Sequence, residues 1–258
     1  MKKSIHTHKK YVLFLLSLTG ILILWELACA RAWISPILLS PPSEIAEALQ
    51  EKLLSGFWNK DLWTTGKAYG SSLLLALLIG VPLGLAMGLS KSIFHLVNPY
   101  VITMNALPKI ILCPLVMMWL GTGMNARVFL GTLMASFPII TATLTGIQSI
   151  DRGYIELAKI YQSSKAKTLK DIILPSLSPY ILSGLRVGVN YAMVGVLIIE
   201  FFASSQGVGY RMYAYSQNFS INYFFALLLI TVSFVLLCSS LVYSLERRLG
   251  GWRDAAFK

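Results

Sequence analysis

Charged residues are scarce in this sequence, at 13% of its 258 positions. A soluble domain usually carries about 25% charged residues. Hydrophobic residues make up 56% of the chain, which is about 144 positions and enough for six or seven bilayer-spanning helices of about 20 residues each. Too little of the chain remains for a separate catalytic domain, so a large soluble enzyme is excluded.

Cysteine is also scarce, and several catalytic signatures are missing. Cys29, Cys113 and Cys238 all lie in apolar stretches without CxxC spacing, so we expect neither disulfides nor metal ligands. No GxxxxGK[ST] phosphate loop occurs, which means that this chain is not itself an ATPase. No Ser/His/Asp set or carboxylate pair stands out. We therefore expect no catalytic site and no bound cofactor.

Acidic residues number only 11 against 22 Lys and Arg, which gives a net charge of +11. Such a charge can indicate a nucleic-acid partner. Here, however, the basic residues lie in short segments between long uncharged runs, as in the cytoplasmic loops of membrane proteins. We expect membrane lipid, and no nucleic acid, as the surroundings of this chain.

The sequence predicts an all-α polytopic membrane protein with six transmembrane helices. The expected spans are 11–30, 68–89, 97–120, 128–150, 177–199 and 219–245. The first span could be a signal peptide, because Ala28-Cys29-Ala30 resembles a cleavage site. Its apolar stretch of about 18 residues exceeds the usual 7–15 of a signal peptide, so we expect an uncleaved anchor.

The spans divide the chain into an ordered series of segments. These are a tail (1–10), the first helix (11–30), a connector on the outer side (31–67), a core of five further helices (68–248) containing a cytoplasmic loop (151–176), and a second tail (249–258). With the N-terminus inside, 14 of the 22 Lys and Arg fall in cytoplasmic segments, six fall outside, and two lie within spans. This asymmetry predicts that both termini are cytoplasmic.

Two local patterns predict helix packing and a helix in the connector. Gly80, Gly84 and Gly88 recur every four residues on one helix face, which lets another helix backbone come close. In the connector, Ser43 is a plausible N-cap, followed by Glu44 in the first turn. This short amphipathic helix lies either at the outer membrane interface or against the helix bundle as a connector.

The cytoplasmic loop 151–176 combines four lysines with apolar residues at helical spacing. We expect two short helical pieces, separated at Ser163-Ser164 and closed by Pro175. Ile155, Ala158 and the apolar residues near 172 would anchor them, with the lysines facing water. An exposed helical knob of this kind suits docking of a soluble partner, although an ordinary basic loop would show the same charge.

The stretch ELAKIYQSSKAKTLKDIILPSLSP resembles the "EAA" loop of ABC importer permeases. Matching positions are Glu156, Ala158, Ile172, Leu174 and Pro175. Two positions depart from the pattern, since Leu157 replaces an Ala and Gln162 replaces the usual Gly. The missing glycine removes easy access to a left-handed turn, so we expect the bend between the two helical pieces to differ.

Further matches extend the resemblance from about residue 35 to 248, in the order seen in nitrate/sulfonate/taurine-type permeases. They include Gly80-Val81-Pro82-Leu83-Gly84, Gly184-Leu185-Arg186 and Gly207-Val208-Gly209-Tyr210. The resemblance implies a type I ABC importer permease of the bacterial inner membrane, which translocates a small anionic or heterocyclic solute such as a sulfonate, taurine, nitrate or thiamine precursor. It implies as partners a second permease copy, a cytoplasmic ATPase dimer that holds ATP and Mg²⁺, and a solute-binding protein. The matched loop residues, with Leu157 and Gln162, would contact the ATPase.

Polar residues within the spans are candidates for the solute pathway or its gate. They are Asn105, Lys109, Arg186, Asn190 and Glu200. Each has an alternative role: Lys109 can extend to an interface, Arg186 suits an inner gate or a neighbouring loop, and Glu200 can pair with Arg211 or cap a helix. The asparagines can form hydrogen bonds between helices.

Two other functions would also suit a polytopic protein. An ion-gradient-driven transporter would show inverted repeats and paired membrane carboxylates, but Glu26 is the only acid within the expected spans, with Glu200 just beyond one of them. A membrane-embedded enzyme would need a catalytic or metal-binding cluster, which the sequence lacks.

Overall fold

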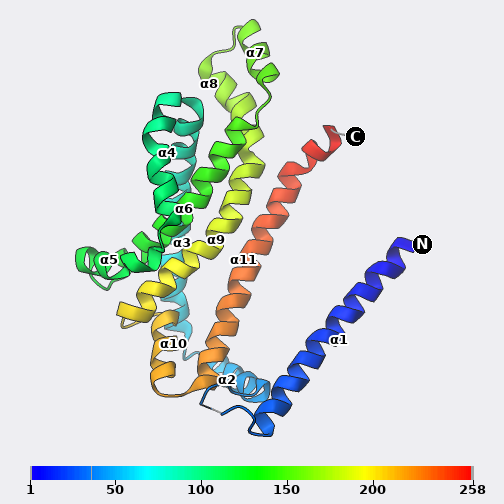
Figure 1. Cartoon of the computed structure of the whole chain (residues 1–258), viewed down its shortest axis with the longest axis vertical. Helices are drawn as coiled ribbons and strands as arrows, with labels where there is room; N and C mark the ends of the chain where they lie inside the picture. The colour runs from blue at the N-terminus through cyan, green and yellow to red at the C-terminus, as the bar shows by residue number, and fades with distance from the viewer. Residues whose placement is uncertain (1, 36, 257–258) are drawn as a thin grey trace. The chain divides into compact units, whose positions relative to one another are not determined.

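The computed structural model describes residues 2–35 and 37–256, and every regular element in these ranges is a helix. The elements follow one another along the chain, and Figure 1 labels the α-helices among them. They are α1 (Lys2–Ala30), α2 (Pro42–Leu54), α3 (Asn59–Leu89), α4 (Lys91–Ala106), η1 (Lys109–Leu112), α5 (Cys113–Leu120), α6 (Met124–Gln148), α7 (Arg152–Ile160), α8 (Lys165–Thr168), η2 (Leu169–Ile173), α9 (Leu174–Ala203), α10 (Val208–Gln217) and α11 (Ile221–Ala256). The all-α prediction is confirmed.

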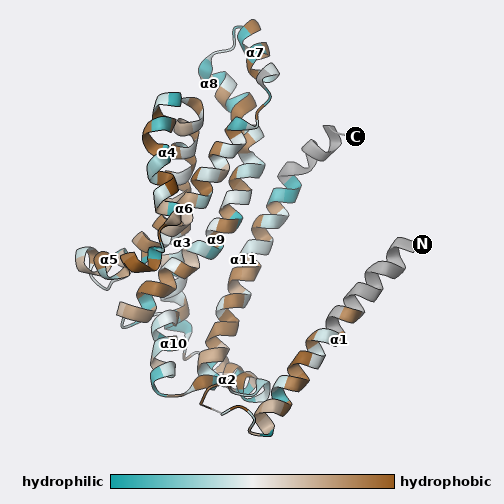
Figure 2. Cartoon of the chain, in the orientation of Figure 1, coloured by the Kyte–Doolittle hydropathy of each residue, from teal (hydrophilic) through white to brown (hydrophobic). Residues whose placement is uncertain are grey.

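Four helices are long and apolar enough to cross a membrane, and a bent pair can supply a fifth span. The four lie in 59–89, 124–148, 165–203 and 221–248. The expected span 97–120 is not one straight helix, because α4 and the η1–α5 segment meet at 95°. Pro108 lies at this break, where its missing N–H cannot continue the helix. The described apolar part of α1, Leu16–Ala30, is shorter than a full span. Figure 2 colours the ribbon by hydropathy, with hydrophobic residues in brown along these helices.

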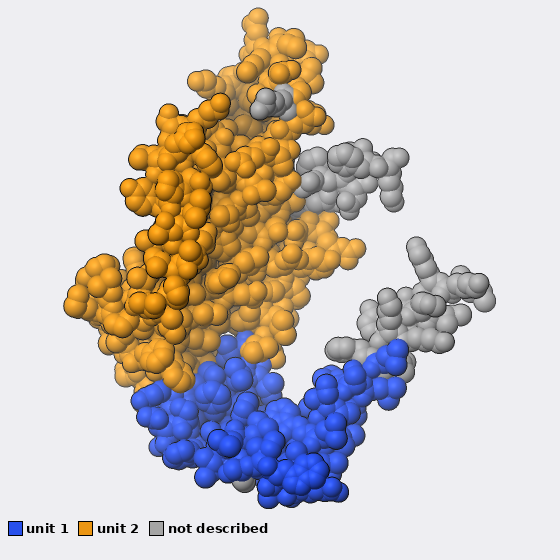
Figure 3. All heavy atoms as spheres, in the orientation of Figure 1, with its two compact units in different colours: residues 1–60, 211–231 blue, residues 61–210, 232–258 orange. Residues whose placement is uncertain are grey.

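The chain forms two compact units, coloured separately in Figure 3. One contains 1–60 and 211–231, and the other contains 61–210 and 232–258.

In the first unit, α2 buries Ile45 and Ala48, which are each 2% exposed. This helix begins at Pro42, so Ser43 is not the N-cap that we expected. Ser43 instead donates its N–H and its hydroxyl to the Glu26 carboxylate, at 3.1 and 2.7 Å. At the other end of α2, hydrogen bonds from Lys52 and from the Tyr223 hydroxyl lower the pKa of Glu51 below its usual value.

The second unit has α3, α6 and α9 at its centre, with a core that includes Ala76, Ile139 and Val189. The three glycines of α3 lie where this helix meets α6. A Cβ atom on Gly80 would lie 2.8 Å from the Ile139 side chain, and one on Gly84 would lie 2.7 Å from Thr143. Because positions further along α3 meet positions further along α6, the two helices run in the same direction.

The backbones of α6 and α9 approach even more closely. A Cβ atom on Gly195 would lie 2.8 Å from the Gly131 Cα and from the Leu130 carbonyl oxygen. Further along, Gly184 of α9 lies against Pro138 and Ala142 of α6. The order of these contacts is reversed between the helices, so α6 and α9 are antiparallel, as alternating membrane crossings require.

Gly195→Ala should destabilise the protein by about 1–3 kcal/mol, because the added methyl overlaps backbone that cannot move aside. Gly70→Ala in α3 is the matched control, since a Cβ atom at that position meets nothing within 4 Å. The control should keep or slightly raise stability, as alanine is the better helix former. Melting temperatures in lipid nanodiscs measure both variants. An unaltered melting temperature for Gly195→Ala would contradict the close approach.

Candidate functional site

The loop that resembles the EAA loop contains the helix α7. Residues of the loop itself cap this helix at both ends. At its start, the Asp151 carboxylate accepts the Gly153 N–H at 2.8 Å. At its end, the Ser163 N–H donates to the Ala158 carbonyl and the Gln162 N–H donates to the Lys159 carbonyl, both at 2.9 Å. This pair of bonds is a Schellman motif, which needs a left-handed residue after the helix.

Gln162 is that left-handed residue, with φ +49°. We expected the bend to differ because glycine is missing, but Gln162 adopts the left-handed conformation that glycine favours. The two hydrogen bonds across the bend offset the steric cost of the side chain. The bend therefore forms despite the substitution, at some cost in local stability.

We expected the second helical piece to end at Pro175, but it continues beyond this residue. Residues Lys165–Ala203 form one continuous helical segment that passes through a π-helical turn at Leu169–Ile173. The Leu174 N–H donates to the Leu169 carbonyl across this wide turn. Pro175 has no N–H, and its ring crowds the preceding helical turn; a widened turn accommodates it. The Ser176 hydroxyl donates to the Ile172 carbonyl at 2.7 Å. The loop thus leads directly into the span α9.

The exposed surface of this loop combines apolar and charged side chains. Ile160 is 73% exposed, Tyr161 82% and Leu157 50%, whereas Ala158 is 7% exposed. Glu156 is exposed, as are Lys159, Lys165, Lys167 and Lys170. Ala158 and Ile173 anchor the segment, while Leu174 and Pro175 lie exposed at the start of α9 and Ile172 is half-buried.

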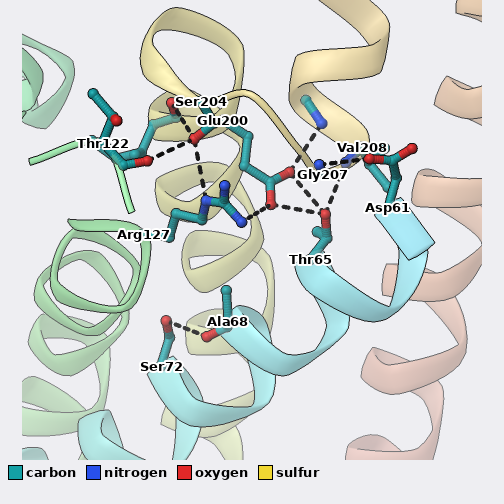
Figure 4. A network of polar contacts seen from close by, with 12 residues as sticks. Asp61, Thr65, Ala68, Ser72, Thr122, Arg127, Glu200, Ser204, Gly207 and Val208 are labelled. Carbon is teal, nitrogen blue, oxygen red and sulfur yellow. Dashed lines mark hydrogen bonds and ion pairs between the residues drawn. The ribbon is translucent and has the colours of Figure 1, made fainter. Parts of the chain in front are cut away.

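A second cluster of polar residues is buried where α6 begins and α9 ends (Figure 4). This is the end of the two helices that lies away from the loop 151–176. Glu200 is fully buried, and its carboxylate lies 3.6 Å from the Arg127 guanidinium. The Thr65 hydroxyl donates to the same carboxylate at 2.8 Å. Arg127 also donates to the Ser204 hydroxyl at 3.2 Å. Glu200 therefore forms its ion pair with Arg127. We expected Arg211 as its partner in one of the two roles predicted for Glu200.

This cluster caps the first turn of α10 with side chains from α3 and α9. The Gly207 N–H donates to Asp61 at 2.8 Å, the Val208 N–H to the Thr65 hydroxyl at 2.9 Å, and the Gly209 N–H to Glu200 at 3.0 Å. These N–H groups would otherwise lack partners at a helix start. Gly207 has φ +106°, and a Cβ atom there would overlap the Glu200 carboxylate. Glu200 therefore caps a neighbouring helix, which was one of its expected roles.

Arg186 pairs with a helix rather than with a loop. Its guanidinium lies 3.6 Å from the Glu246 carboxylate and 5.4 Å from the ring centre of Tyr243, both on α11. One turn along α9, the Asn190 side-chain oxygen accepts the Ser239 hydroxyl at 3.3 Å. The two α9 residues thus form a polar row against α11, with Asn190 exposed and the Arg186 side chain 40% exposed.

Lys109 and Asn105 lie on either side of the break between α4 and η1. The Lys109 ammonium lies 3.5 Å from the Asn105 carbonyl oxygen and 5.3 Å from the ring centre of Phe137. Asn105 is exposed and Lys109 is half-buried. The structure does not bring this pair into contact with the polar row of Arg186 and Asn190.

Sequence reasoning missed Arg127, Thr65 and Asp61. Arg127 was counted in an outer segment because it precedes the apolar run of α6, yet only 6% of it is exposed. The available signal was Glu200, since a membrane carboxylate needs a partner. A basic residue at the matching end of another span was the natural candidate.

The family model described as "Binding-protein-dependent transport system inner membrane component" matches residues 77–251. This chain belongs to that family. It is 28% identical to the taurine transport system permease protein TauC of Escherichia coli, over 92% of this chain and 88% of TauC. It is 27% identical to the formylaminopyrimidine transport permease protein ThiX of Halalkalibacterium halodurans, over 98% and 99% of the two chains.

The fold is similar to that of a chain in an inward-facing structure of the MetNI methionine ABC transporter, with a TM-score of 0.65 and 18% identity. The match covers 73% of this permease and 94% of that chain. The type I ABC importer permease fold is confirmed. This permease is the multi-pass membrane subunit of an importer for small solutes, and it is not an enzyme. The ion-gradient-driven transporter is likewise set aside.

Arg127→Leu should cost about 3–5 kcal/mol of stability, because it leaves the fully buried Glu200 without its cation. The double variant Arg127→Leu/Glu200→Gln should recover part of that loss. Arg186→Leu is the matched control, since its pair with Glu246 is partly exposed and worth about 0–1 kcal/mol. Thermal unfolding in nanodiscs measures all three. Equal losses for Arg127→Leu and Arg186→Leu would contradict a stabilising buried pair.

Gln162→Gly should stabilise the bend after α7 by about 1 kcal/mol, because glycine adopts positive φ without steric cost. Gln162→Val should weaken it, since a β-branched residue disfavours this conformation. Hydrogen exchange of the Gln162 and Ser163 amides reports the change. Slower exchange in Gln162→Gly and faster exchange in Gln162→Val are expected; the reverse order would rule out a left-handed Gln162.

Proposed function

We propose that this permease couples solute import to ATP hydrolysis through α7, which docks on a cytoplasmic ABC ATPase subunit. The observation that carries the proposal is the length of the helical segment behind α7. Residues Lys165–Ala203 number 39, which corresponds to about 58 Å at 1.5 Å per residue. The hydrocarbon layer is only about 30 Å thick. The beginning of the segment, together with α7, therefore projects into water.

The composition of the projecting surface supports a protein partner. Leu157, Ile160 and Tyr161 expose half or more of their surface beyond the membrane, where apolar patches mark interaction sites. The exposed lysines around them favour a partner with an acidic rim, because charge complementarity speeds association. Glu156 is an acidic residue within this mainly basic surface, so it would meet a basic group of the ATPase.

The assembly that we propose contains two copies of this permease, an ATPase dimer and a solute-binding protein. ATP and Mg²⁺ are held by the ATPase, and this chain binds no cofactor. Both termini lie in the cytoplasm of a bacterial cell, with the permease in its inner membrane. Closure of the ATPases shifts the permease between two conformations, as any ligand does that binds one state better.

We propose a small anionic or heterocyclic solute, in line with the printed names of TauC and ThiX. The half-exposed Lys109 with Asn105, and the polar row of Arg186 and Asn190, are the groups that would line the pathway or its gate. Exposed polar side chains at membrane depth favour a water-filled path over lipid. The ligand retained by the partner solute-binding protein identifies the solute.

Glu156→Lys should abolish solute transport and lower ATPase association, because it reverses the charge at the centre of the docking surface. Glu47→Lys is the matched control, as it reverses a charge that is also exposed, on α2 and outside this loop. Co-purification of the ATPase and uptake in proteoliposomes measure the two effects. Normal assembly and transport by Glu156→Lys would refute docking through α7.

A further inference from the structure

A hollow of about 480 Å³ opens beside α7 in the loop 151–176, which is the docking segment that we propose. It lies between α7 and the α8–η2 helix, so residues from both elements line it. Tyr154, Leu157, Ala158 and Tyr161 contribute from α7 and the bend, and Ile172 contributes from η2. Its volume is within the range of about 300–1,000 Å³ that is typical of binding pockets.

The lining favours an uncharged and apolar occupant. Ala158 is 7% exposed and Ile172 is half-buried, and the two tyrosine rings add apolar surface. The charged lining residues, Lys167 and Asp171, have opposite signs, so the hollow carries no net charge that would select an ion. An aromatic ring gains most here, because aromatic pairs add favourable edge and face contacts to the burial of apolar area.

We propose that the hollow receives one aromatic side chain from a loop or helix end of the ATPase subunit. This inference rests on the proposed function, because the hollow belongs to the same docking segment. Docking is then reciprocal: α7 enters the partner, and a side chain of the partner enters beside α7. Such paired anchors are typical of the energetic centre of a protein interface.

An occupied hollow also has a mechanical consequence. Its lining joins α7 to η2, and η2 leads into α9. An inserted ring contacts both sides and fixes α7 relative to the start of α9. The partner therefore acts on the span directly, and its movement is not absorbed by the bend at Gln162.

The test places a bulky side chain at the edge of the hollow. Ser163 lines the hollow and Ala166, three residues on, is exposed and does not line it. In the permease–ATPase complex in nanodiscs, Ser163→Trp should weaken ATPase binding by at least about tenfold, because it occupies the space that the partner needs. Ala166→Trp, the matched control, should change the Kd by less than about threefold. If the Kd of Ser163→Trp also changes by less than about threefold, the proposal is overturned.

A second measurement identifies the occupant without depending on the folding of Ser163→Trp. A benzophenone amino acid replaces Tyr161, which keeps an aromatic ring in the lining, and the complex is then irradiated. A cross-link to an ATPase segment that carries an aromatic residue supports the proposal. Cross-links solely to lipid, to the second permease copy or within the chain overturn it.

Comparison with Glu156→Lys separates this proposal from the function on which it rests. If Glu156→Lys releases the ATPase while Ser163→Trp does not, docking through α7 stands and only the hollow is refuted. If neither variant weakens binding, both the hollow and docking through α7 are refuted.

Discussion

The backbones of α6 and α9 meet at Gly131 and Gly195, where one added methyl group would overlap the neighbouring helix. Lipid tails solvate apolar side chains well, so association of helices in a membrane depends on such close approach of small residues. The antiparallel crossing brings Arg127, four residues before Gly131, to the same end as Glu200, five residues after Gly195. It also brings the end of α6 beside the start of α9, where Gly146 contacts Leu177 and Tyr180. Both candidate sites therefore depend on one helix crossing.

The buried pair at one end of this crossing makes a sharp change of chain direction possible. Between α9 and α10 the chain has only Ser204–Gly207 in which to turn, and the first N–H groups of α10 are buried. Ionised acceptors form stronger hydrogen bonds than neutral ones, and Glu200 and Asp61 supply them. Arg127 offsets the cost of burying the Glu200 charge. The ion pair, the cap and the turn are thus one arrangement that no single residue could maintain.

Local and periodic signals allowed much of the fold to be predicted from the sequence. Long apolar runs predict the spans, and the α3 glycines at four-residue spacing predict a helix face that admits close contact. For the Arg127–Glu200 pair, the sequence could only point to a basic residue at the matching end of another span. The register between α6 and α9 is a tertiary property, and the two residues lie 73 positions apart. The 95° bend at Pro108 was also beyond prediction, since proline interrupts a helix without fixing the angle that follows.

The loop 151–176 shows where sequence rules and tertiary context compete. The sequence pattern correctly predicted a break in the helix near Ser163. It also predicted an altered bend at Gln162 and the end of the helix at Pro175, which the structure does not show. At Gln162 the Schellman hydrogen bonds outweigh the steric preference against positive φ. At Pro175 the π-turn spreads the backbone, so the helix continues and joins α8 to α9. Because α6 and α9 are fixed to each other by their glycines, α7 is connected at both of its ends to one rigid pair of helices.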